Sequence, residues 1–299
     1  MLRVTAGTVS RSTSHRSSVL LFFVFLALSY LGLSVHAAQT RIRSALDGLP
    51  AAAFVGPAAL LAAALAYALA TGLPIGPRAG PYTGYLFVPA LLWIPGRRST
   101  RPSPLRALAT AAAVWLPLEF RLLPSLPLPP PDGFDAIRLV GIVAAFYLFL
   151  VARPIDKMGY TFLLDRRDYL SACLAFAGYA VVALPLGLVS GFLTWHPQLN
   201  VGSVLLTPAI IYLTTAVPEE FLFRGLIQNV FARIVDPRAA LIAASVVFGL
   251  AHLPDLRYVA LATLAGVAYG WVYARTGKIT ASALTHAAVD WIWVLLLRR

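Results

Sequence analysis

Two adjacent carboxylates in an apolar segment are the residues of this chain best suited to chemistry. Glu219 and Glu220, two of only three glutamates, lie in a stretch otherwise rich in Ile, Leu, Phe and Val. A charge at the centre of a bilayer costs at least about 2.5–3.5 kcal/mol, so such residues are rare and usually functional. Arg224 follows Glu220 by four residues, which places the two on one helix face as a predicted ion pair. Glu219 lies about 100° round the helix and faces other groups.

Two further pairs in the second half of the chain repeat this four-residue spacing. Phe248 precedes His252 by four residues, and His286 precedes Asp290 by four. Each pair therefore shares one face of its own helix. The repeated pattern in otherwise apolar helices predicts faces turned toward a common interior.

The depths of these residues along their helices support a single site. Counted inward at about 1.5 Å per residue, Glu219 lies about 21 Å from Arg233. Counted in the same way from Ala239, His252 lies about 20 Å in. Counted from Lys278, His286 lies about 12 Å in and Asp290 about 18 Å in. The hydrocarbon core is about 30 Å thick, so these levels overlap inside it. The sequence thus permits one site that also includes the neighbouring Glu220.

The chemistry open to this set is hydrolysis by activated water. A carboxylate beside a histidine can hold a water molecule and take its proton as a general base. A second histidine, oriented by an aspartate, could donate a hydrogen bond to a developing oxyanion. The chain has no Gly-x-Ser-x-Gly segment, and we expect no serine or cysteine beside these pairs. We therefore expect amide-bond hydrolysis without a covalent nucleophile.

Several other readings use the same residues. Glu219, His252 and His286 could form a three-ligand zinc site; activity that chelation abolishes and zinc alone restores would favour that reading. Each pair could also be structural: a buried ion pair for Glu220, a position at the membrane boundary for His252, or a helix-packing hydrogen bond for His286. Phe248 is expected to pack and to seat His252. The whole cluster could instead serve a transporter or a non-catalytic scaffold.

The composition is that of a membrane protein. Hydrophobic residues make up 59% of the 299-residue chain and charged residues 12%, against about 25% charged residues in soluble domains. We predict an all-α, polytopic transmembrane bundle of about eight to ten helices. The net charge of +12 comes from arginines in short loops and at the termini, which indicates membrane topology rather than nucleic-acid binding. The single cysteine, Cys173, is expected to be a small buried hydrophobe.

Ten apolar runs mark the expected helices. A proline-rich linker at 124–133 and a charged loop at 153–168 interrupt them, and the loop suggests two domains, 1–168 and 169–299. The runs cover residues 19–35, 50–72, 82–95, 104–123, 134–152, 169–194, 203–232, 239–253, 256–274 and 279–297.

The first run has the layout of a signal peptide as well as that of a first transmembrane helix. A basic segment precedes it, and Val35-His36-Ala37 resembles a cleavage site. We favour an uncleaved helix because many spans follow; absence of residues 1–37 from the mature protein would contradict this. The basic turns at 97–106, 233–238 and 275–278 are expected to be cytoplasmic, and 196–200 external.

The three motifs together resemble those of the CPBP family, which comprises CAAX prenyl proteases of the Rce1 type and bacterial intramembrane glutamic endopeptidases. These motifs are Glu219-Glu220-x-x-x-Arg224, Phe248-x-x-x-His252 and His286-x-x-x-Asp290, and the resemblance covers roughly residues 169–297. It implies that Glu219 activates water together with His252, and that Glu220 pairs with Arg224. It also implies an oxyanion hole formed by His286 and residue 290.

One position departs from the family pattern. The better-studied prenyl proteases have Asn where this chain has Asp290, and an ionised carboxylate only accepts hydrogen bonds. Asp290 would then orient His286. The resemblance further implies a multi-pass protein, most simply of the bacterial cytoplasmic membrane, without a cofactor. Its partners would be membrane lipid and a membrane-bound or lipid-modified peptide substrate. Relatives in peptide maturation and bacteriocin immunity leave the substrate open.

Overall fold

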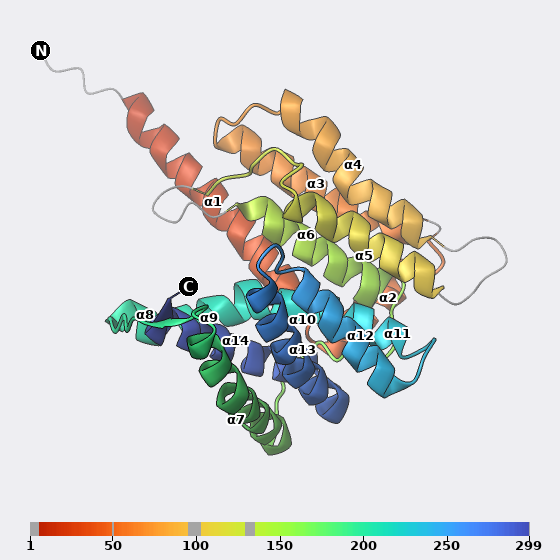
Figure 1. Cartoon of the computed structure of the whole chain (residues 1–299). Coiled ribbons are helices and arrows are strands. Elements are labelled where there is room, and N and C mark those ends of the chain that lie inside the picture. Colours follow the sequence, from red (N-terminus) through yellow and green to blue (C-terminus); the bar gives the residue numbers. More distant parts are fainter. Residues whose placement is uncertain (1–5, 50, 95–102, 129–134, 299) are drawn as a thin grey trace, which may run out of the picture. The chain divides into compact units, whose positions relative to one another are not determined.

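The chain is almost entirely helical and divides into two compact units. The computed structural model describes residues 6–49, 51–94, 103–128 and 135–298. Helix accounts for 77% of the described residues, and the units are residues 1–155 and 156–299 (Figure 1). Within the described ranges the paired strands are β1 (Thr194–Trp195) and β2 (Leu297–Arg298), two residues each. The predicted all-α class is therefore confirmed.

The first unit is a bundle of helices. Helices α3 to α6 pack in sequence order, and α1 packs against α3 and α6 (Figure 1). The elements are α1 (Ala6–Gly32), α2 (His36–Leu46), α3 (Ala52–Ala70), α4 (Gly76–Trp93), α5 (Pro104–Glu119), α6 (Ala136–Tyr147) and the π-helical η1 (Leu148–Ala152), which continues α6.

Side chains of the first unit hold the proline-rich linker by donating hydrogen bonds to its backbone carbonyls. The buried Arg78 guanidinium donates to the Ser125 carbonyl at 3.0 and 3.1 Å, and the Tyr82 hydroxyl donates to the Pro124 carbonyl at 3.0 Å. Part of the predicted linker, residues 129–133, lies outside the described residues. So does most of the predicted basic turn, at 97–102.

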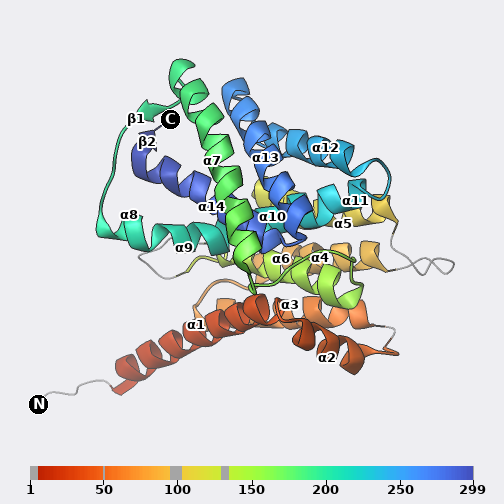
Figure 2. The same ribbon diagram turned by 90° about the horizontal axis from the view of Figure 1, so that it is seen from below.

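The second unit packs four long helices around a broken one. Helix α13 contacts α7, α12 and α14, while the broken run from α9 to α11 packs against α14 and α12 (Figure 2). The elements are α7 (Arg166–Val189), α8 (Val201–Leu205), α9 (Thr207–Ile211), η2 (Tyr212–Ala216), α10 (Val217–Glu220), η3 (Phe221–Gln228), α11 (Asn229–Phe231), α12 (Pro237–Leu250), α13 (Leu256–Thr276) and α14 (Ile279–Leu296).

An extended segment at 156–165, here called the strap, ties one end of these helices together. The Asn229 side chain donates to the Asp156 carbonyl at 2.8 Å, and the Ile279 amide donates to the Gly159 carbonyl at 3.1 Å. Two of the three charged turns that we expected on one side of the membrane, 233–238 and 275–278, therefore lie next to residues that bond to this one backbone segment.

The same end carries a charge cluster. Lys278, at the start of α14, lies 2.6 Å from the Asp168 carboxylate, and this hydrogen bond raises the pKa of Lys278. Asp165 caps α7 by accepting the Arg167 and Asp168 amides at 2.8 and 3.1 Å. These contacts fix the entry of α7 against the start of α14.

Side chains of the strap also support the helix that carries the adjacent glutamates. The Tyr160 ring meets the Phe221 ring edge-on, with 6.2 Å between centroids. A Cβ at Gly225 would lie 3.0 Å from the end of Met158. The strap therefore sets the position of the helical turn that follows Glu220.

Each predicted apolar run corresponds to a helix or a continuous helical run, and the described chain has one helix more. This is α2, a short polar helix that follows α1 after a bend of 102°. By length and composition, three described helices can cross a membrane: α3, α7 and α14. The number rises to four if the bent pair of α1 and α2 counts as one span.

The prediction for Cys173 is wrong: its side chain is exposed, because it lies on an outer face of α7. The functional division at residue 168 stays a prediction.

The strap gives a sharp test of the fold. Gly159 has φ +65°, and a Cβ there would overlap the backbone carbonyl of Gly277. We expect Gly159→Ala to destabilise the second unit by at least about 1–3 kcal/mol, since a left-handed conformation and a backbone clash combine. Thermal unfolding in detergent measures this. Gly178→Ala is the control, because α7 leaves open space there; equal unfolding temperatures for the two variants would contradict the account.

Candidate active site

The adjacent glutamates lie where the helix changes its winding. The short α-helical turn of α10 carries Glu219 and Glu220 and stands between two π-helical segments, η2 and η3. Pro218 lies at the start of this turn, where its ring would clash with the carbonyl four residues earlier in a regular α-helix. Single π-helical turns are frequent at functional sites. The local sequence thus interrupts a regular helix at the two carboxylates.

Glu220 is fully buried and is bonded from three directions. Arg224 Nε lies 3.1 Å from its Oε2, and the Ser282 hydroxyl donates to the same oxygen at 2.5 Å. His286 Nδ1 lies 2.9 Å from Oε1. A carboxylate only accepts hydrogen bonds, so this imidazole nitrogen carries its proton and donates. The predicted pair with Arg224 is confirmed as geometry, and Glu220 is also tied to α14.

Glu219 has a different environment. Its side chain is 35% exposed, and its Oε2 lies 3.8 Å from His286 Nε2. Asp290 is 34% exposed, and its Oδ2 lies 3.5 Å from the same nitrogen. The buried His286 imidazole therefore faces Glu220 through Nδ1, and Glu219 and Asp290 through Nε2. The 3.5 Å separation confirms the expected shared face of His286 and Asp290.

His252 lies just beyond the end of α12, in the turn that leads to α13. Its Nδ1 lies 2.8 Å from the Phe248 carbonyl. Because a carbonyl only accepts, Nδ1 is the donor, and when the ring is neutral Nε2 carries the lone pair. The Phe248 ring contacts the His252 ring at 4.9 Å and the His286 ring at 5.6 Å. Phe248 thus seats His252, as expected, and also touches the second histidine.

Arg224 is enclosed by aromatic rings and by α13. Its guanidinium lies 5.5 Å from the Phe248 ring centre and 6.0 Å from that of Tyr269. Its Nη1 lies 3.5 Å from the Gln228 side-chain oxygen, and its Nη2 is buried without a hydrogen-bond partner. A Cβ at Gly270 would lie 2.8 Å from Gln228 Oε1 and 3.3 Å from Nη1. The absence of a side chain at Gly270 makes room for the buried charge.

The structure adds residues that the motifs did not reveal and corrects one expectation. We expected no serine beside these pairs, but the hydroxyl of the fully buried Ser282 donates to Glu220, and its oxygen also lies 2.8 Å from the Tyr269 carbonyl oxygen. The four-residue spacing from Ser282 to His286 could have revealed it. The Tyr269 ring stacks on His286 at 4.6 Å, and no sequence signal distinguishes it from a packing residue.

The alternative of a zinc site can be compared with this geometry. Within the part of the chain that the structure describes, no three His, Cys, Asp or Glu side chains form a group that could hold a metal ion. The residues proposed as ligands, Glu219, His252 and His286, are therefore not arranged as a ligand set.

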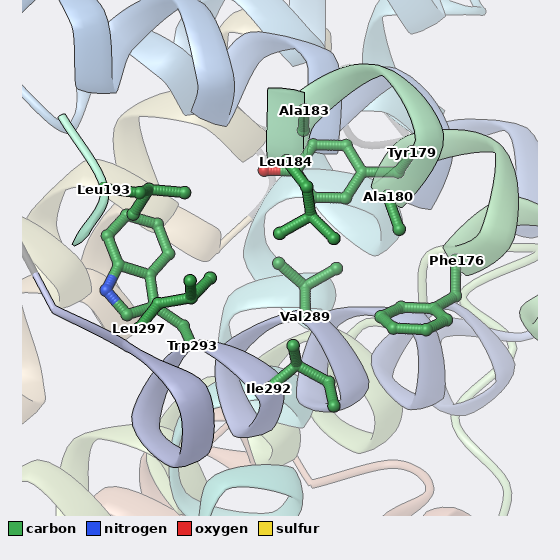
Figure 3. A pocket seen from close by; sticks show the side chains of 10 residues that line it. All are labelled: Phe176, Tyr179, Ala180, Ala183, Leu184, Leu193, Val289, Ile292, Trp293 and Leu297. Atoms are coloured by element: carbon green, nitrogen blue, oxygen red, sulfur yellow. The ribbon is translucent and has the colours of Figure 1, made fainter. Parts of the chain in front are cut away.

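An apolar cavity lies between α7 and α14, beside the end of the site that holds Asp290. Val289, adjacent to Asp290 in sequence, points into it from α14, and Tyr179 from α7 interacts electrostatically with Asp290. Figure 3 shows how the side chains of the two helices converge. The cavity is lined by Phe176, Tyr179, Ala180, Ala183, Leu184, Leu193, Val289, Ile292, Trp293 and Leu297.

The buried ion pair makes a testable contribution to stability. Glu220→Gln leaves the Arg224 charge buried without its partner, which destabilises proteins by about 3–5 kcal/mol. The control is Asp255→Asn at the exposed Arg257–Asp255 pair, where Asn still caps the helix and the expected loss is at most about 1 kcal/mol.

A double variant separates the pair from general damage. Removing both charges in Glu220→Gln/Arg224→Met should recover part of the loss, because no unpaired charge remains. Thermal unfolding of Glu220→Gln, Arg224→Met and the double variant in detergent, each compared with the wild type, measures the coupling. Strictly additive losses would contradict the account of a directly coupled pair.

Comparison with known proteins places the site in a family. Residues 200–292, just under a third of the 299-residue chain, match the model of the type II CAAX prenyl endopeptidase Rce1-like family. The match spans all three motifs and is shorter than the 169–297 expected from the resemblance. No match to the chain was found among the curated proteins or among the solved structures. The predicted recognition is confirmed: the segment 200–292 is a domain of the type II CAAX prenyl endopeptidase Rce1-like family.

Proposed function

We propose that this protein is a multi-pass intramembrane endopeptidase in which Glu219 activates the attacking water. Its Rce1-like domain implies a membrane protease. The observation that carries the finer proposal is the contrast between two adjacent carboxylates. Glu220 is fully buried and bonded to Arg224, Ser282 and His286, whereas Glu219 is 35% exposed beside His286.

The first step is attack on the scissile carbonyl. Glu219 takes a proton from a water molecule while the water oxygen forms a bond to the carbonyl carbon. His252 holds the same water through Nε2, which its bond to the Phe248 carbonyl leaves as an acceptor. The carbonyl electron pair moves to oxygen and yields a tetrahedral oxyanion.

His286 and Glu219 complete the reaction. His286 Nε2, when protonated, donates to the oxyanion, and Asp290 at 3.5 Å keeps the imidazole aimed at it. The tetrahedral intermediate then collapses, the C–N bond breaks, and Glu219 returns its proton to the leaving amine. The products are one carboxylic acid and one amine, so one water is consumed per bond.

The family and the apolar cavity support an apolar, membrane-associated substrate. A CAAX protease family implies a membrane-associated peptide, and the cavity beside Asp290 presents almost only hydrocarbon. We propose that an alkyl group or apolar side chain of the substrate enters this cavity. The protein would then act in the cytoplasmic membrane on a membrane-bound or lipid-modified peptide.

Loss of the Glu219 carboxylate tests the reaction. We expect Glu219→Gln and His252→Ala to abolish cleavage of membrane peptides, because an amide cannot take the proton from water and a methyl group cannot hold the water in place. Quantitative proteomics of membrane fractions from cells carrying each variant measures this. Glu119→Gln, a change at an exposed glutamate of the first unit, is the matched control. Unchanged cleavage products with Glu219→Gln, together with retained cellular function, would instead indicate a scaffold.

Filling the cavity tests the substrate. Ala180 lines the cavity, whereas Ala177 on the same helix is exposed and does not line it. We expect Ala180→Leu to reduce cleavage of the peptides identified above most strongly when they carry large apolar groups, because the added carbons occupy the space. Ala177→Leu should leave all products unchanged. Equal product profiles for the two variants would refute this role of the cavity.

A further inference from the structure

We propose that Tyr258 is a positioning residue that fixes the orientation and tautomer of His252. This inference rests on the proposed function, in which His252 holds the water. The ring centroids of Tyr258 and His252 are 4.4 Å apart with an interplanar angle of 70°. This is a closer ring contact than the 4.9 Å that His252 makes with Phe248 of α12.

His252 needs such a restraint because of its place in the chain. Helix α12 ends at Leu250, and His252 belongs to the turn that follows, so no helical turn encloses its side chain. The ring torsion of histidine is broad and roughly two-fold. The hydrogen bond from Nδ1 to the Phe248 carbonyl selects one orientation, and the adjacent Phe248 and Tyr258 rings oppose rotation out of it.

Tyr258 is itself held in place by two further aromatic residues. Its ring lies 5.4 Å from that of Trp293 on α14 and 5.4 Å from that of Phe192, in the segment after α7. Phe192 is almost fully buried, and the Arg257 guanidinium lies 5.6 Å from its ring centre. Phe192, Tyr258 and Trp293 form an aromatic wedge.

The wedge connects His252 to the helix that carries the rest of the site. Trp293 lies three residues after Asp290 on α14. Tyr258 lies in the first turn of α13, which is capped by Asp255 through a hydrogen bond of 2.9 Å from the Arg257 amide. Through Trp293 and Tyr258, the wedge therefore holds the His252 ring in a fixed position relative to α14. A ring turned by 180° would place Cε1 where Nε2 lies and Cδ2 where Nδ1 lies, and would lose the bond to Phe248.

The experiment measures the His252 tautomer directly. Full-length protein labelled with ¹⁵N-histidine is studied by NMR in detergent micelles, and the His252 signals are assigned by their loss in His252→Ala. We expect a single tautomer with Nδ1 protonated in the wild type and in Tyr258→Phe, which keeps the ring. Tyr258→Leu should give mixed tautomers, and Tyr258→Met gives a second reading should the leucine variant fold poorly.

Packing and positioning are separated by a matched variant. Phe192→Leu removes a ring from the wedge but leaves the Tyr258 ring, so it should lower stability and keep the single tautomer. In cleavage assays, Tyr258→Leu should lower kcat about 10- to 100-fold with little change in KM, and Tyr258→Phe should restore kcat. A single, unchanged His252 tautomer in both Tyr258→Leu and Tyr258→Met would overturn the proposal. The NMR result does not depend on cleavage, whereas cleavage that survives His252→Ala would contradict only the proposed function.

Discussion

The buried charge of Glu220 is the constraint on which the second unit depends. An apolar bundle can hold a carboxylate only if hydrogen-bond donors and a counter-charge surround it. Arg224 supplies the charge from the same helix, while Ser282 and His286 supply donors from α14. This requirement joins the Glu-Glu turn to α14 and leaves α13 to shelter the guanidinium through Gly270 and Tyr269. The strap then secures the end of the same helices.

The difference between the two glutamates follows from that constraint. Because Glu220 occupies the donors, its neighbour, about 100° round the helix, projects toward a more open region. His286 lies between them, with one ring nitrogen on the structural carboxylate and the other near Glu219 and Asp290. A single histidine thereby links the residue that stabilises the bundle to the residues proposed to act on the substrate. In such a site, loss of stability and loss of activity need separate measurement.

The sequence predicted the parts of this arrangement that follow from helical periodicity. The four-residue spacing placed Glu220 with Arg224 and His286 with Asp290, and apolar runs located the long helices. The sequence did not predict contacts between different helices when the residues involved carry no charge and belong to no motif. Ser282 and Tyr269 look like packing residues until α13 and α14 are placed together. The polar helix α2 has no apolar run, and the exposed face of α7 that carries Cys173 looks the same in sequence as a buried one.

The most direct test of the central claim is a structure of the protein with a phosphinic analogue of a peptide that it cleaves. The phosphinyl group mimics the tetrahedral intermediate and carries two oxygens. The account predicts one oxygen within hydrogen-bond distance of His286 Nε2 and the other beside the Glu219 carboxyl group, with Glu220 still bonded to Arg224. A phosphinyl group bound away from Glu219, or bound to a metal ion held by Glu219, His252 and His286, would contradict it.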